Sequence, residues 1–182
     1  MPHAIGLVEL SSIAKGIETG DAMLKTAEVT LLTAKTVCPG KYIVMVGGDV
    51  AAVRQSVAVG VALADRRLVD HFLIPNVHPA ILPSISGVTP IDEMRAVGVV
   101  ETFSVAACIE SADASVKAAN VVPIRTHLAF GIGGKCYYVL TGDVADVDAA
   151  VKAGIDLAGG KGLLVHYTVI PRPHRQLVEV LL

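Results

Sequence analysis

The most reactive side chains of this sequence are its three thiols, Cys38, Cys108 and Cys136. They are odd in number, far apart and without a Cys-x-x-Cys pair, so they predict neither a disulfide framework nor a zinc finger within one chain. Cys38 is followed by Pro39-Gly40, which predicts a tight turn and so favours an exposed thiol. Cys-Pro also ends the run of cluster-binding cysteines in bacterial ferredoxins. A free cysteine usually packs as a small buried apolar residue. Cys38 alone therefore leaves an iron ligand and a buried thiol both open.

Other patterns that could carry chemistry are incomplete. The glycine-rich segment 131–135 lacks the phosphate-loop pattern, because Ala129 stands at its first glycine and Cys136 at its hydroxyl position. It predicts a flexible turn whose amides could bind a polar metabolite. His78 and His174 have no second histidine or carboxylate at ligand spacing, which indicates a structural role. There is no nucleophile elbow, paired-carboxylate motif or nucleotide fingerprint, so we expect a protein that is not an enzyme.

The composition indicates a folded protein with little net charge. Of 182 residues, 53% are hydrophobic and 18% charged, and the formal net charge is -2. This excludes a disordered chain and argues against nucleic acid or a membrane as partner. No apolar run approaches the ~20 residues that span a bilayer, and no signal-peptide pattern begins the sequence, so we expect a cytoplasmic protein. With only 4% aromatic residues, the many Ala, Val and Gly residues could form a flat surface that packs against copies of the chain.

The chain is an internal duplication. Residues 4–29 match residues 96–121 at an offset of 92, with 13 of the 26 positions identical where about two are expected by chance. The offset grows to 94 at the Gly-Asp-Val-Ala segment 48–51, and to 96 at Ile-Pro-x-x-His, residues 74–78. Each repeat therefore has the size of a small domain.

Turn-forming residues separate the two repeats: Pro79, Pro83, Ser84, Ser86, Gly87 and Pro90. Since clusters of Pro, Gly and Ser mark loops, we predict a first domain over residues 1–83, a linker over 84–94 and a second domain over 95–182.

Each repeat predicts the order β-α-β-β-α-β. The alternating apolar run 4–10 predicts a strand, and the β-branched runs 29–37 and 42–46 predict a hairpin. The run 68–75 predicts the last strand. Ser11 or Ser12 can cap a first helix, and Asp49 and Asp143 can cap the second helices. The residues that we expect on the buried helix faces are Ile13, Ile17, Leu24 and Ala27; Val50, Val53, Val57, Val61 and Ala64; and Val144, Val147, Val151 and Ile155. The fold class is α+β, with two tandem ferredoxin-like (split βαβ) domains.

Motifs in both repeats carry a family resemblance. Ala-Ile-Gly-Leu-Val-Glu from Ala4, Gly-Asp-Ala-Met-Leu-Lys-Thr-Ala from Gly20, Gly-Gly-Asp-Val-Ala-Ala-Val from Gly47 and Ile-Pro-Arg-Pro-His from Ile170 resemble the bacterial microcompartment shell domain. The resemblance implies a tile in the shell of a microcompartment. Tandem members form homotrimers that imitate hexamers and assemble with other shell proteins in a two-dimensional layer; three copies of a fused pair can close the same ring as six single domains.

The segments Leu31–Lys41 and Ala129–Tyr137 are similar to those of the iron-sulfur type of tandem shell protein found with propanediol-utilisation microcompartments. The resemblance implies that the loops between the second and third strands line a central pore. The expected lining residues are Val37, Cys38, Pro39 and Gly40 of the first repeat, and Phe130, Gly131, Ile132, Gly133 and Gly134 of the second. Only the first loop holds a thiol, so a trimer would present three copies of Cys38 at its axis.

Three thiolates around an axis could ligate three irons of one [4Fe-4S] cluster shared by three chains, whereas one thiolate cannot hold a cluster. Water, a small ligand or a partner's side chain would complete the coordination of the fourth iron. We expect this cluster to transfer electrons across the shell, with an encapsulated or cytosolic redox protein as partner. A bare thiol ring or a zinc site, a metal-free metabolite pore, and a ligand-sensing module outside any shell remain alternatives.

The resemblance also implies contacts at the tile edge. Lys25, Lys117 and Arg172 occupy the matching positions, although isolated surface lysines are usually only solvated. The first repeat has Asn76 where the second has Arg172, so the edges should not be equivalent. Cys108 and Cys136 replace Gly16 and Tyr42 of the first repeat, and we expect both to be packing residues.

Overall fold

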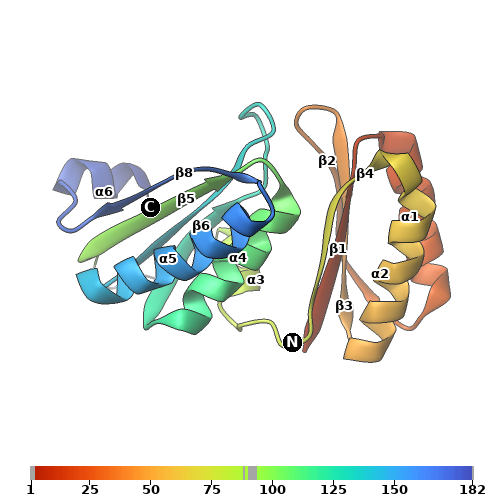
Figure 1. The fold of residues 1–182 in the computed structure, drawn as a ribbon, viewed down its shortest axis with the longest axis horizontal. Helices are drawn as coiled ribbons and strands as arrows, with labels where there is room; N and C mark the ends of the chain where they lie inside the picture. Colours follow the sequence, from red (N-terminus) through yellow and green to blue (C-terminus); the bar gives the residue numbers. More distant parts are fainter. Residues whose placement is uncertain (1–2, 88, 90–93, 182) are drawn as a thin grey trace. The chain divides into compact units, whose positions relative to one another are not determined.

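The structure is a computed structural model that describes residues 3–87, 89 and 94–181. The first repeat contains β1 (Ala4–Leu10), α1 (Ile13–Thr26), β2 (Thr30–Val37), β3 (Lys41–Gly48), α2 (Val50–Ala64), the 3-10 turn η1 (Asp65–Arg67) and β4 (Leu68–Ile74). Its sheet has the order β2-β3-β1-β4, and all neighbouring strands are antiparallel. Figure 1 shows α1 and α2 on one face of this sheet. This confirms the predicted split βαβ domain.

The second repeat has the same architecture. After α3 (Ile81–Ser86) it contains β5 (Ala96–Thr102), α4 (Val105–Ala118), β6 (Val121–His127), β7 (Cys136–Gly142), α5 (Val144–Gly160), β8 (Leu164–Ile170) and α6 (Arg175–Leu181). The sheet order is β6-β7-β5-β8, again antiparallel throughout. The predicted duplication is therefore a duplication of topology as well as of sequence.

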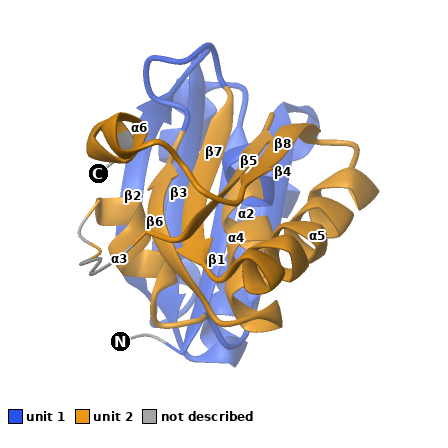
Figure 2. Ribbon diagram, turned by 90° about the vertical axis from the view of Figure 1, so that its left-hand side faces the viewer, with its two compact units in different colours: residues 1–77, 104–107, 129–134 blue, residues 78–103, 108–128, 135–182 orange. Residues whose placement is uncertain are grey.

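The chain divides into two compact units that do not coincide with the repeats (Figure 2). Unit 1 holds residues 1–77 together with 104–107 and 129–134, and unit 2 holds the remaining segments. The start of α4 and most of the β6–β7 loop thus belong to unit 1.

A helix occupies the start of the predicted linker 84–94. Pro83, Ser84 and Ser86 lie in α3, and Gly87 ends that helix with a φ of 76°, a left-handed conformation that glycine adopts easily. The start of the predicted linker is therefore helical. Pro90 lies outside the described part of the chain.

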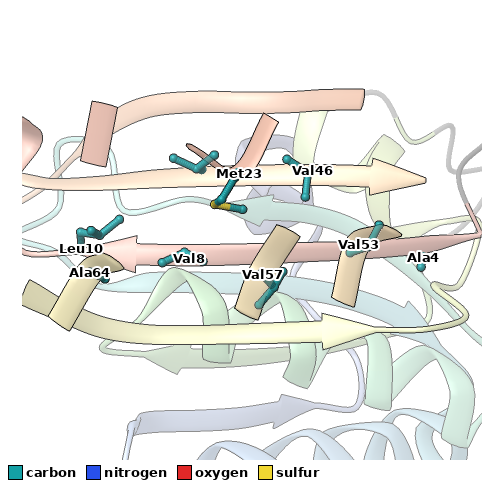
Figure 3. Close-up of a cluster of buried hydrophobic side chains, with 9 residues drawn as sticks. Ala4, Val8, Leu10, Met23, Val46, Val53, Val57 and Ala64 are labelled. Carbon is teal, nitrogen blue, oxygen red and sulfur yellow. The ribbon is translucent and has the colours of Figure 1, made fainter. Parts of the chain in front are cut away.

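One apolar cluster fills the space between the first sheet and its two helices (Figure 3). Its buried members are Ala4, Val8, Leu10, Met23, Val44, Val46, Val53, Val57 and Ala64. The shared motif Ala-x-Gly has a packing reason, because a Cβ on Gly6 would lie 2.4 Å from Val57 and 2.8 Å from Val53. The missing side chain lets α2 lie directly on β1.

The predicted strand over residues 4–10 is confirmed as β1, and all seven of its residues are buried. β1 lies between β3 and β4 in the sheet. Glu9 is one of these buried residues, which gives an unexpected charged group in the interior.

The predicted buried face of α1 is wrong. Ile13, Ile17 and Leu24 are exposed, and α1 instead buries a face of small residues and Met23. At Gly16 an added Cβ would lie 2.5 Å from the ring of Tyr42, so the helix approaches its sheet too closely for larger side chains. Ala27 follows the last helical residue as the C-cap.

The second helices follow the prediction more closely. In α2, Val53, Val57 and Ala64 are buried, with Val50 and Val61 packed against the same cluster. In α5, Val147 and Val151 are buried and Ile155 is half-buried, but Val144 in the first turn is exposed.

The helix starts were also placed correctly. Ser12 caps α1, where its Oγ accepts a hydrogen bond from Lys15 N at 3.4 Å. Asp49 and Asp143 occupy the expected N-cap positions, yet neither side chain makes a capping hydrogen bond. The Asp143 carboxylate instead pairs with Arg95 at 2.7 Å.

Candidate functional site

Cys38 lies at the tip of the β2–β3 hairpin. Val37 pairs with Lys41 across the hairpin, and residues 38–40 form the turn between them. The Cys38–Pro39 peptide bond is cis, and Gly40 has a φ of 73°. The predicted tight turn is therefore confirmed, and the strands on either side of it fix the position of the thiol.

The second predicted pore loop contacts this turn within unit 1. The Cys38 N–H donates to the Ala129 carbonyl at 3.0 Å. Gly134 packs so closely that an added Cβ would lie 2.5 Å from Pro39 Cδ and 3.0 Å from Cys38 O. The two loops therefore contact each other through the backbone of Cys38, the Ala129 carbonyl and the Pro39 ring.

Exposure divides the predicted pore residues into three groups. Pro39, Gly40, Phe130, Gly131 and Gly133 are exposed, Cys38 and Ile132 are half-buried, and Val37 and Gly134 are buried. The exposed part of the two loops therefore consists of Pro39, glycines and the apolar side chain of Phe130.

One chain offers a single accessible sulfur here. No three His, Cys, Asp or Glu side chains among the described residues come together as a metal site. Cys108 and Cys136 are fully buried, which confirms their predicted packing role. A metal centre at Cys38 would therefore need ligands from other chains, a requirement that a symmetric assembly meets.

The predicted edge residues lie on the surface. Lys25 pairs with Asp21 at 2.6 Å, Lys117 pairs with Asp113 at 2.5 Å, and Arg172 is exposed. The structure holds no partner chain, so their contacts with neighbouring tiles stay a prediction.

Both matched histidines organise the turn after the last strand of their repeat. Nδ1 of His78 accepts a hydrogen bond from Ala80 N, and Nδ1 of His174 accepts one from Gln176 N, each at 3.3 Å. This local bonding confirms the predicted structural role.

Sequence reasoning missed a buried charged cluster around Glu9. Its carboxylate accepts hydrogen bonds from Lys41 Nζ at 2.5 Å, Val105 N at 2.8 Å and Ala106 N at 3.2 Å. All four residues belong to unit 1. The available signal was the repetition itself, because a Glu at the end of the first strand and a Lys at the start of the third recur in both repeats.

Comparison with known proteins identifies the family. The sequence model of the BMC domain matches residues 4–77 and again residues 96–173. The chain is a tandem-domain member of the bacterial microcompartment shell-protein family. The bacterial microcompartment shell protein PduT of Citrobacter freundii is 58% identical over 183 residues, covering 98% of this chain and 100% of the relative.

Other similar proteins match about half of the chain or nearly all of it. The shell protein EutM of Salmonella typhimurium is 45% identical over 87 residues, which cover 48% of this chain and 88% of EutM. A crystal structure of a microcompartment protein from Desulfitobacterium hafniense superposes with a TM-score of 0.86 at 51% identity, covering 97% of this chain and 98% of that one. This microcompartment shell protein therefore carries two BMC domains. Within the described residues, no helix is long and apolar enough to cross a bilayer.

Proposed function

We propose that the chain forms a homotrimeric, pseudohexagonal shell tile in which three copies of Cys38 hold one [4Fe-4S] cluster at the central pore. The observation that carries this proposal is the position of Cys38, half-buried at a hairpin tip and tied by its backbone to the glycine loop of the second repeat. The full-length similarity to PduT, a bacterial microcompartment shell protein, supports the tile.

The chemistry of the loops fits three thiolate ligands. The second loop has Phe130 and glycines where the first has Cys38, so a ring of three chains presents three sulfurs rather than six. Three thiolates would ligate three irons of a [4Fe-4S] cluster, and water or a partner's side chain would be the ligand of the fourth iron. The hydrogen bond from Cys38 N–H to the Ala129 carbonyl helps to hold the Cys38 turn in place.

Bound at this position, the cluster supplies one-electron transfer. The Cys38 thiolates of the chains would hold it, and the second loop adds the exposed apolar side chain of Phe130. Such a cluster would let the tile exchange electrons with an encapsulated or cytosolic redox protein, with no bond chemistry assigned to protein residues. Lys25, Lys117 and Arg172 contact neighbouring tiles in the layer.

Anaerobic purification followed by iron and sulfide analysis tests the cluster. We expect a coloured protein with one cluster per three chains, and Cys38→Ser should remove both colour and iron. Cys108→Ala is the matched control, because Cys108 is buried and should leave the cluster intact. Iron retained after Cys38→Ser would overturn the assignment. A colourless wild-type trimer without iron would instead favour the metal-free metabolite pore, and a monomer that forms no sheets would refute the tile.

A further inference from the structure

The two buried cysteines of the second repeat stand at positions that face each other in the first. Cys108 in α4 matches Gly16 in α1 at the offset of 92. Cys136, the first residue of β7, matches Tyr42 in β3 at the offset of 94. A Cβ on Gly16 would lie only 2.6 Å from the Cβ of Tyr42. The matching positions of the second repeat therefore belong to a helix and a strand that pack directly on each other.

Strand pairing shows that the two strand positions are equivalent. Leu10 of β1 pairs with Tyr42 in the first sheet. Thr102 of β5, which lies 92 positions after Leu10, pairs with Cys136 in the second sheet. Because side chains alternate between the two faces of a strand, the same register places Cys136 on the sheet face that Tyr42 occupies in the first repeat.

Hydrogen bonds within unit 2 align α4 with β7 independently. Tyr138 Oη on β7 lies 2.9 Å from Ser111 Oγ and 2.8 Å from Ser115 Oγ, both on α4. Cys136 precedes Tyr138 by two residues, so the two share one face of β7. Cys108 precedes Ser111 by three residues, so the two share one face of α4. Both cysteines therefore lie next to the Tyr138 contact, one on each element.

The two elements also run in the same direction. β5 and β6 are each antiparallel to β7 and hence parallel to each other. Because α4 connects them, it runs back against β5 and along β7. A step toward the start of β7 is then also a step toward the start of α4, which places Cys136 opposite Cys108. The first repeat has the same order, since one turn after Gly16 an added Cβ on Gly20 would lie 3.3 Å from Val44.

The spacing of the two positions suits a disulfide. Bonded cysteines have Cβ atoms about 3.5–4.5 Å apart. The 2.6 Å of the first repeat is too short for two real side chains, so a cysteine pair requires a helix about 1 Å further from its sheet. Ala112 stands where α1 has Gly20 and adds a side chain between helix and sheet. We expect this separation to bring the Cβ atoms of Cys108 and Cys136 into the disulfide range.

The two thiols are free in the structure, and neither residue has exposed surface. Cys136 Sγ donates to the His127 carbonyl at 2.7 Å, so its side chain has to leave this bond before it can react. Burial is the main cause of the raised pKa of Tyr138, and Cys108 adds to it electrostatically. The Cys108 sulfur therefore lies near the Tyr138 side chain, on the β7 face that also carries Cys136.

We propose that Cys108 and Cys136 are a redox pair, which hydrogen peroxide converts into a disulfide within one chain. Peroxide oxidises one thiol to a sulfenic acid and releases one water molecule. The other thiol attacks this sulfur; the S–S bond forms, the S–O bond breaks and a second water molecule leaves. The two thiols thus lose two electrons and two protons, and one peroxide is reduced to two waters.

The pair has the properties of a reversible modification site. Because neither sulfur is exposed, a small uncharged oxidant such as peroxide reaches it more readily than a bulky disulfide reagent. A dithiol can reopen the bond by thiol–disulfide exchange. When closed, the bond joins α4 to the strand that follows the glycine-rich segment 131–135. Since both thiols belong to one chain, the site depends neither on the proposed trimer nor on Cys38.

Peptide mapping tests the pair in the wild-type chain. After treatment with hydrogen peroxide, the remaining thiols are alkylated in denaturant and the chain is cut with trypsin. Cys108 lies in the tryptic peptide 96–117, Cys136 in 136–152 and Cys38 in 36–41. We expect the first two peptides to be joined, with a mass two hydrogens below their sum, and dithiothreitol should separate them.

A matched variant moves one thiol to the other face of β7. Cys136→Ala with Tyr137→Cys keeps three cysteines but shifts the sulfur by one residue, which turns it away from α4. This variant should give no link between the peptides 96–117 and 136–152. Cys38→Ser should form the link as fully as the wild-type chain, because Cys38 takes no part in it.

Urea denaturation gives a second readout. A disulfide restricts the unfolded chain between its two cysteines. Peroxide treatment should therefore move the unfolding midpoint of the wild-type chain to a higher urea concentration, and dithiothreitol should move it back. In Cys108→Ala the same treatment should not raise the midpoint, and a rise equal to that of the wild-type chain would contradict the pair.

The outcomes separate this inference from the proposed function. Cys108 and Cys136 that stay free after peroxide treatment, or that oxidise to sulfinic acids without a link, would overturn the redox pair and leave the tile and its cluster untouched. A link from either residue to the peptide 36–41 would overturn it as well. A wild-type chain that forms the pair but contains no iron would refute the cluster alone.

Discussion

Replacing Glu9 by glutamine should destabilise the chain strongly. The side chain has no exposed surface, and its carboxylate binds Lys41 Nζ and two backbone N–H groups at the start of α4. The substitution keeps the size of the side chain but removes its charge. Lys41, itself only 11% exposed, then loses its ion pair with Glu9.

The magnitude follows from this burial. Removing one partner of a buried ion pair costs about 3–5 kcal/mol. Gln keeps one carbonyl oxygen for a helix N–H, so we expect Glu9→Gln near the lower limit, about 3 kcal/mol. Glu9→Ala loses every bond and leaves a cavity, which places it near about 5 kcal/mol.

Urea denaturation at a single protein concentration measures these differences. Glu18→Gln is the control, because Glu18 pairs with Lys15 on the surface of α1 and such pairs contribute less than about 1 kcal/mol. Combining Glu9→Gln with Lys41→Met should cost less than the sum of the single changes, since the two residues interact directly. A loss below about 1 kcal/mol for Glu9→Gln would refute the view that charge holds this helix start.

Three further changes concern the interior. Gly154→Ala should cost about 1–3 kcal/mol in urea denaturation, because its Cβ would lie 2.0 Å from Tyr138 Oη, and adding Tyr138→Phe should recover part of the loss. Burial raises the pKa of Tyr138 above its ordinary value, so the folded chain keeps a proton that the unfolded chain releases; stability should fall as pH rises above about 10, and less so in Tyr138→Phe. Thr19→Val should raise the melting temperature through a gain of about 1 kcal/mol, because Thr19 Oγ1 is buried without a hydrogen-bond partner; a loss would contradict this.

The topology could be predicted because the duplication shows each pattern twice. The strand and helix order, the hairpin at Cys38-Pro39-Gly40 and the helix starts at Ser12, Asp49 and Asp143 all agree with the structure. The packing role of Cys108 and Cys136 could also be predicted. Both are buried, at the positions that match Gly16 and Tyr42 of the first repeat.

The face of α1 could not be predicted from periodicity. A stripe of apolar residues shows that a helix covers something, but not whether the cover is its own sheet or another surface. In α1 the sheet is approached by Gly16 and Gly20, whose small size allows contact with Tyr42 and Val44. The burial of Glu9 was not predicted for a related reason, because the helix start that it binds is 96 residues away in the sequence.

The Glu9 cluster has a consequence for the chain cut into halves. The first repeat carries the acceptor, Glu9 with Lys41, and at Ser12-Ile13-Ala14 it also carries a helix start like the one that Glu9 binds. In a fragment that ends before the second repeat, the Glu9 carboxylate of one copy could therefore bind the helix start of the next copy, head to tail. Such a fragment should assemble into closed rings of identical subunits. In the full chain, the covalent link between the two repeats then sets the order in which they alternate around the ring.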